Sequence, residues 1–230
     1  MNEYIKNIAA FNNEIDALTN QSETEAAISK CYELQAYLEN LESTNTDSFD
    51  ISRVLGIGYF DLGSSYRVLS IAETAETAYL ASMDHLQRAI KSDEHKEFAT
   101  NQLAACKNHL GLLFMDQGPV GKAIKYLDQA IWDRKYIVDQ YPQNMENKVY
   151  LAGALCNRGH VERNAGRPKS ASIHYKDSIA LLEEVLSPYD PENQDAYASA
   201  ISNAMGHPHW VITAQSFLQN ASAGLEAAQS

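Results

Sequence analysis

The chain has 230 residues, of which 45% are hydrophobic and 21% charged, with only 11 Gly and 6 Pro. This is the composition of a globular chain that can bury a sizeable core, and it favours helix. The formal net charge of −12 disfavours nucleic acid and anionic membrane as partners, because both are bound through a cationic surface. A basic partner fits this charge better, although a merely solvated acidic surface is the commoner reason for such a value.

Apolar residues recur at steps of three and four positions along most of the chain, which predicts amphipathic helices. Polar runs and Gly-Pro pairs interrupt this pattern and divide it into pairs of antiparallel helices. Four such hairpins are expected, at about residues 2–42, 50–91, 97–141 and 146–186. Further helices are expected at about residues 191–225, with a break or kink at Gly206-His-Pro208.

The turns between paired helices have recognisable signals. Ser22 and Glu25 have the spacing of a capping box, which predicts that Ser22 caps the second helix. Gly118 and Pro119 predict the end of a helix, since Gly accepts the left-handed conformation found there and Pro cannot continue the helix. The same signal returns at Gly166, one hairpin later.

A short pattern recurs every 48 residues: a Gly, an Ala twelve positions later, a large residue four beyond it and a small one three further on. Its copies are Gly63, Ala75, Tyr79, Ser82; Gly111, Ala123, Leu127, Ala130; and Gly159, Ala171, Tyr175, Ser178. We expect the Gly and Ala where paired helices approach closely, and the large residue beside them. One period upstream, Ala27 and Cys31 take the Ala and large positions, which favours a further N-terminal hairpin. Helix pairs with a fixed period are typical of an α-solenoid.

These residues resemble the tetratricopeptide repeat (TPR) family. Its pattern is matched by Leu62-Gly63, Tyr66, Ala75, Tyr79, Ser82 and by Leu110-Gly111, Phe114, Ala123, Leu127, Ala130. The third copy departs from the pattern at Arg158 and Glu162, so its first helix is expected to pack more loosely. The period exceeds the family's usual length of about 34 residues, and in this the chain resembles long-period tandem repeats of bacterial, planctomycete-like proteins. The resemblance implies an all-α superhelix (solenoid) of about four hairpins plus a C-terminal helix, in a single TPR-like domain over residues 1–230.

The resemblance also implies a non-catalytic module that binds a peptide or helix of another protein in the concave groove lined by the first helix of each hairpin. The groove positions of the family correspond here to six candidate partner-binding residues: Arg67, Asn108, His109, Asn157, His160 and Arg163. Nearby positions of the same helix face include Phe60, Asp61 and Ser64.

Asn157 matches an Asn that in many family members hydrogen-bonds the peptide backbone. Arg67, Arg163 and His160 would form a cationic strip able to hold a carboxylate or phosphate. The alternative is that these residues are only the solvated face of the helices. Together with Arg158 and Glu162, the polar residues around Asn157 form the set that we expect first to carry function.

A self-associating scaffold element of a signalling assembly is the alternative function, since the open ends of a solenoid expose apolar surface that a second copy could cover. The partner would then be a homo-oligomer. No enzyme is expected, and neither a cofactor nor a metal, because no nucleophile, metal-ligand set or carboxylate pair stands in a catalytic context. His207 and His209 are expected in a loop or at a helix start.

Cys31, Cys106 and Cys156 lie far apart within apolar helical patterns, which predicts buried, reduced thiols. The N-terminus has no secretory signal and no apolar run reaches 18 residues, so we expect a cytoplasmic location and no membrane partner. Trp132 lies off the apolar stripe of its helix; packing against the next hairpin is favoured over an exposed anchor for a partner.

Overall fold

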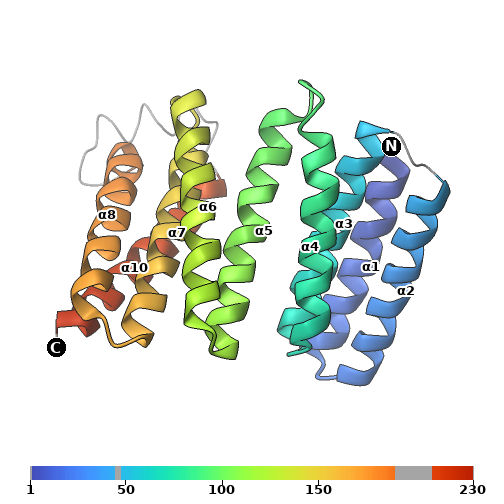
Figure 1. Cartoon of the computed structure of the whole chain (residues 1–230), viewed down its shortest axis with the longest axis horizontal. Coiled ribbons are helices and arrows are strands. Elements are labelled where there is room, and N and C mark those ends of the chain that lie inside the picture. The colour runs from blue at the N-terminus through green and yellow to red at the C-terminus, as the bar shows by residue number, and fades with distance from the viewer. Residues whose placement is uncertain (1, 45–47, 190–208, 230) are drawn as a thin grey trace. The chain divides into compact units, whose positions relative to one another are not determined.

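A computed structural model describes residues 2–44, 48–189 and 209–229 of the chain (Figure 1). Over these ranges the structure is helical and contains no strand, so the predicted all-α class is confirmed. The chain divides into two compact units, Met1–Gly118 and Pro119–Ser230, so that the predicted hairpin at 97–141 contributes one helix to each. The helix expected from residue 191 and the break at Gly206-His-Pro208 lie outside the described residues.

The first unit holds two layers of helices. In chain order its helices are α1 (Asn2–Asn20), α2 (Thr24–Thr44), α3 (Phe49–Val68), α4 (Ala72–Ala89) and α5 (Lys96–Gln117). Each helix packs against the next along the chain, and α3 also packs directly against α1 and α5. The first helices of successive hairpins therefore form one layer, α1–α3–α5, and the second helices α2 and α4 cover it (Figure 1).

The second unit repeats this arrangement around one complete hairpin. Its helices are α6 (Val120–Gln140), α7 (Met145–Asn164), α8 (Pro168–Leu186), the short 3-10 helix η1 (Ser187–Tyr189) and α10 (His209–Gln229). Helix α10 packs against both α7 and α8, which is the position of a first helix in a following hairpin. It continues to Gln229, although the segment from Asn220 to Gly224 has weak helical propensity, because Ala221 and Gly224 are buried against the hairpin.

The turn that ends the first helix of each hairpin repeats with the 48-residue period. The residues with positive φ in the described chain are Ser22 (61°), Ser70 (61°), Gly118 (102°) and Gly166 (71°). At Ser70 the amide donates to Arg67 O and the next amide donates to Tyr66 O, the pair of bonds that closes a helix through a left-handed residue. The same bonds form at Ser22, which supports the N-terminal hairpin as a member of the repeat.

Ser22 therefore ends α1, and the prediction that it caps α2 is wrong. Helix α2 begins at Thr24, and the first helical bond runs from Ala27 N to Glu23 O. A left-handed φ of 61° at Ser22 is incompatible with the extended conformation of an N-cap residue.

Replacing Ser70 with Gly should stabilise the protein. Gly adopts a left-handed φ at no steric cost, whereas an L-residue loses roughly 1–2 kcal/mol there, so after the entropy cost of Gly we expect a gain of about 1 kcal/mol. Urea denaturation followed by circular dichroism measures it. Ser29→Gly is the matched control: Ser29 is exposed inside α2, and the change should cost about 1 kcal/mol. An equal loss in both variants would contradict the strain at Ser70.

The repeated small and large residues pack as expected. A Cβ added at Gly63 would lie 2.8 Å from the ring of Tyr79, and one added at Gly159 would lie 2.7 Å from the ring of Tyr175. The small polar residue of the pattern bonds across the same hairpin: Ser82 Oγ donates to Gly56 O at 2.6 Å, and Ser178 Oγ donates to Ala152 O at 2.8 Å. Helix pairs α3–α4 and α7–α8 are thus held by equivalent contacts.

The three cysteines are buried and free, as predicted. Burial raises the pKa of the Cys31 and Cys156 thiols to about 11. Trp132 differs from the favoured interpretation, since 76% of its surface is exposed. Its position off the apolar stripe of α6 leaves the ring exposed to solvent.

Candidate functional site

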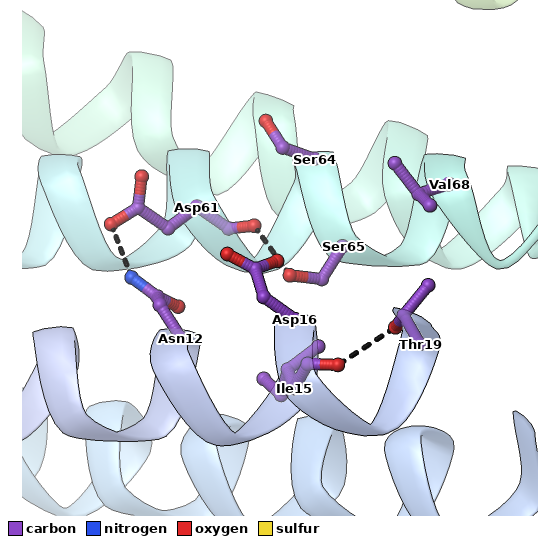
Figure 2. Close-up of a pocket in the computed structure, with 8 residues that line it drawn as sticks. All are labelled: Asn12, Ile15, Asp16, Thr19, Asp61, Ser64, Ser65 and Val68. Atoms are coloured by element: carbon purple, nitrogen blue, oxygen red, sulfur yellow. Dashed lines mark hydrogen bonds between the residues drawn. The ribbon is translucent and has the colours of Figure 1, made fainter. Parts of the chain in front are cut away.

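A pocket of about 320 Å³ lies between α1 and α3 in the first unit (Figure 2). Six of its eight lining residues are polar, and all eight come from the facing sides of the two helices: Asn12, Ile15, Asp16, Thr19, Asp61, Ser64, Ser65 and Val68. Both helices are first helices of hairpins, so the pocket lies in the layer where the family resemblance predicts a binding groove.

Asp61 is the most buried carboxyl group of this pocket. Asn12 Nδ2 donates to Asp61 Oδ2 at 2.7 Å. Burial raises the pKa of the Asp61 carboxyl to about 6; the Asn12 hydrogen bond opposes this rise, and the negative charge of Asp16 adds to it. Neither Asp61 nor Asp16 forms an ion pair with any described residue, so the pocket contains negative charge without a counter-charge.

The hydroxyl groups of the pocket donate hydrogen bonds to carbonyl groups of the helix backbone. Thr19 Oγ1 donates to Ile15 O at 2.7 Å, Ser64 Oγ to Phe60 O at 3.0 Å and Ser65 Oγ to Asp61 O at 3.1 Å. This is the usual bond of a helical Ser or Thr to the carbonyl four residues earlier. What these hydroxyls offer to the pocket is therefore oxygen lone pairs, which accept hydrogen bonds.

Of the predicted binding residues in the first unit, Arg67 is half-buried in the last turn of α3 and forms no ion pair with a described residue. Asn108 and His109 are half-buried on α5. His109 Nδ1 lies 3.1 Å from the Tyr79 hydroxyl, and its ring stands edge-on to Phe60 with centroids 4.9 Å apart. These contacts make His109 part of the packing between α3, α4 and α5.

The other three predicted residues lie on α7 in the second unit. His160 Nδ1 lies 2.8 Å from the Tyr175 hydroxyl, and its Nε2 lies 3.4 Å from Cys156 Sγ. Burial lowers the pKa of His160, and the charge of Arg163 lowers it further. Asn157 and Arg163 are half-buried on the same helix. Because Arg67 and Arg163 belong to different units, the cationic strip they would share stays a prediction.

The prediction that the helix around Arg158 and Glu162 packs loosely is wrong. Both are buried, at 8% and 3% exposure. Arg158 Nε donates to Asp128 Oδ1 of α6 at 2.7 Å, and the same guanidinium pairs with Glu162. Arg167, in the turn before α8, reaches Glu162 Oε2 at 2.5 Å. These charges tie α6, α7 and the α7–α8 turn together, and a buried charge of this kind is tolerated only because it is paired.

Sequence analysis missed the α1 side of the pocket. Asn12, Asp16 and Thr19 lie 48 residues before Phe60, Ser64 and Arg67, three positions of the predicted groove face. Carrying the groove positions back by one period would have found them, as it did for the packing residues Ala27 and Cys31.

Among the described residues there is no group of three or more His, Cys, Asp or Glu side chains that could hold a metal ion. His207 lies outside them, and of His209 only the backbone is described, as the start of α10. No described helix is both long and apolar enough to cross a membrane.

Comparison with known proteins gives matches in structure only. No family model matches the chain, and no curated protein matches it. The crystal structure of BtubC (BKLC) from P. vanneervenii is similar, with a TM-score of 0.60 at 15% sequence identity, over 98% of this chain and 80% of that one.

Two crystal structures of the nearly identical TPR-like repeats of a putative kinesin light chain from Podosopora anserina, one of them a variant with a single substitution, are also similar. Their TM-scores are 0.54 and 0.53, each at 14% identity and over 98% of both chains. The chain therefore has the fold of the tetratricopeptide-like helical repeats, as the recurring Gly, Ala and aromatic residues of its sequence predicted.

Proposed function

We propose that this chain is a non-catalytic protein-interaction module that binds a peptide or a helix of a partner protein along its first helices. The observation that carries the proposal is the pocket between α1 and α3, which lies in the layer of first helices and is lined by Asp61 and Ser64. Both residues occupy positions that line the groove in the family that the sequence resembles. A helical-repeat fold supports the proposal, because stacked hairpins present extended surfaces for binding.

The six predicted residues have different parts in this proposal. Arg67 follows Ser64 by one turn on α3 and extends the pocket surface toward the end of the helix. Asn157 and Arg163 are the corresponding contacts of α7 in the second unit. Asn108 lies on α5, the next first helix of the first unit. His109 and His160 bond to the hydroxyls of Tyr79 and Tyr175 and support the surface from beneath.

The state of the reactive side chains supports a binding role over catalysis. The thiols of Cys31 and Cys156 have pKa values of about 11 because they are buried, so they remain protonated and are poor nucleophiles. Free, buried thiols also suit the reducing conditions of the cytoplasm, where we place the protein.

Selection of peptides from a displayed random library on the immobilised full chain tests the proposal. The affinity of an enriched peptide is then measured by fluorescence anisotropy for the wild type and for Ser65→Leu, in which a larger side chain fills the α1–α3 pocket. We expect binding to weaken roughly tenfold or more, as at a central contact of an interface.

Thr77→Leu is the control. Thr77 lies on α4, a second helix, and lines a separate pocket of about 180 Å³ together with residues of α2 and α3. The affinity of Thr77→Leu for the peptide should equal that of the wild type. If enriched peptides bind Ser65→Leu as tightly as the wild type, or if no peptide is enriched, the groove between α1 and α3 is not the binding surface.

A further inference from the structure

We propose that the pocket between α1 and α3 receives the cationic side chain of a lysine or arginine in the partner, with Asp61 and Asp16 as its counter-charges. The inference rests on the proposed function and names the chemistry that one part of the groove recognises. Three features of the pocket support it: its unpaired charge, its hydrogen-bonding groups and its shape.

The charge of the pocket has no partner within the described part of the protein. The Asp61 carboxylate receives one side-chain hydrogen bond, from the neutral amide of Asn12, and Asp16 carries a second negative charge on the facing helix. Arg67 lies one to two turns further along α3 and pairs with neither, according to the contacts of the described residues. Because a buried carboxylate without a cation is unfavourable, a bound cation would be stabilised by the charge that the fold leaves uncompensated.

The hydrogen-bonding groups select the same ligand. Thr19 and Ser65 donate their hydroxyl hydrogens to backbone carbonyls, and the amide of Asn12 donates to Asp61 (Figure 2). Ser64 likewise donates to the carbonyl of Phe60. Apart from the second N–H of Asn12, the polar groups that remain for a ligand are acceptors: the two carboxylates, the buried Asn12 Oδ1, which has no hydrogen-bond partner among the described residues, and the hydroxyl lone pairs that Tyr79 does not occupy at Ser64. A lysine ammonium has three donors and no acceptor, and an arginine guanidinium has five donors and no acceptor. A carboxylate or phosphate would instead place lone pairs against lone pairs.

The shape of the pocket suits a long side chain. Its volume of about 320 Å³ is lined by the side chains of Ile15 and Val68 beside the polar groups. Val68 is 68% exposed, so it offers apolar surface to the methylene groups of a ligand while the charged end reaches the carboxylates. The net charge of −12 favours the approach of a cationic partner from solution.

Nuclear magnetic resonance on the 15N-labelled full chain tests the inference with two small probes, Nα-acetyl-lysine methylamide and its uncharged counterpart Nα-acetyl-norleucine methylamide. At pH 7.5 the lysine probe should shift the amide signals of Ser64, Ser65 and Val68, and the norleucine probe should leave them in place. In Asp61→Asn the lysine probe should bind about tenfold more weakly, the loss expected when a charged partner of a hydrogen bond is removed.

Asp93→Asn is the matched control. It removes one negative charge from the same unit at an exposed residue outside the pocket, so the affinity for the lysine probe should be unchanged. An equal loss in Asp61→Asn and Asp93→Asn would show that only the overall charge attracts the probe, and it would overturn the inference.

The affinity should also fall with pH as Asp61 takes up a proton. The groups that act on its charge are Asn12 and Asp16 of α1, and its own charge acts on Tyr79 of α4. With a pKa of about 6 for Asp61, binding should weaken about tenfold between pH 7.5 and pH 5, while the lysine probe stays charged.

Two outcomes overturn the inference outright: equal shifts from the norleucine probe, or no shift from the lysine probe at millimolar concentration. The proposed function is tested separately. Library peptides that need the space beside Ser65 but contain neither lysine nor arginine would retain the binding function and exclude a cationic ligand. If the lysine probe binds but no peptide is enriched, the cation site is retained and the proposed peptide-binding function is excluded.

Discussion

Gly159→Ala should lower the free energy of unfolding by about 1–2 kcal/mol. The added Cβ would lie 2.7–3.0 Å from three ring atoms of Tyr175, a fully buried side chain. The ring cannot move away, because Gly224 of α10 packs closely against it from another helix. A Cβ added at Gly224 would lie only 2.5 Å from Tyr175 Cζ. Overpacking of a core costs roughly 1–3 kcal/mol, and the better helix propensity of Ala returns up to about 1 kcal/mol.

Urea denaturation followed by circular dichroism measures this loss, with Gly121→Ala as the control. A Cβ at Gly121 meets no atom within 4 Å, so the same substitution near the start of α6 should be neutral or stabilise by about 0.5 kcal/mol. If Gly159→Ala and Gly121→Ala have equal stability, the close contact between α7 and α8 does not require a Gly.

Asp61→Asn should stabilise the protein at pH 7.5 by about 1–3 kcal/mol, while it removes the proposed cation site. The pKa of Asp61 rises from 3.8 to about 6 in the folded chain because the carboxyl is buried, and a shift of this size corresponds to about 3 kcal/mol at most. Water in the open pocket reduces that figure. Asn keeps an oxygen that accepts the Asn12 hydrogen bond but carries no charge.

The pH dependence identifies the cause. A raised pKa means that the folded state binds the proton more tightly than the unfolded state, so Asp61 stabilises the fold below about pH 4 and this contribution is lost as pH rises through about 6. The stability difference between Asp61→Asn and the wild type should therefore be small at pH 4 and grow to a plateau above pH 7. A difference independent of pH, or a loss of stability at pH 7.5, would exclude an uncompensated carboxylate.

Asp61 is therefore expected to lower the stability of the free protein at pH 7.5. A carboxylate that destabilises the free protein and binds a cation is typical of a functional position. Gly159 differs from Asp61, because replacing it is expected to destabilise the protein. Its role is to leave space for the ring of Tyr175.

Much of the architecture could be predicted from the sequence, because it depends on periodic residue types. The spacing of small and large residues located the helix pairs, and the burial of Tyr79 and Tyr175 against Gly63 and Gly159 follows from it. The unclustered cysteines were correctly predicted to be buried thiols. These features are local or repeat at a fixed interval, so the sequence of this one chain was enough to find them.

Other features depend on residues that only the fold brings together. Arg158 and Glu162 depart from the repeat pattern and predicted a loosely packed helix, but Asp128 and Arg167 make them part of a buried network. Ser22 has the spacing of a cap, but the bonds that close α1 give it a left-handed φ. The role of Arg158 and Glu162 is set by partners that periodicity does not describe, whereas the turn at Ser22 lies two periods before the one at Gly118 and could have been found from it.

The candidate site shows the division most clearly. The sequence by itself determined the helix pairs, their 48-residue interval and the face of α3 that carries Asp61 and Ser64. Only the tertiary structure decided that Asn12 and Asp16 of α1 face them, and that no cation accompanies the two carboxylates among the described residues. Periodicity reports which side of a helix is buried, whereas the charge balance of a pocket depends on the neighbouring helix, and the chain's order does not specify that contact.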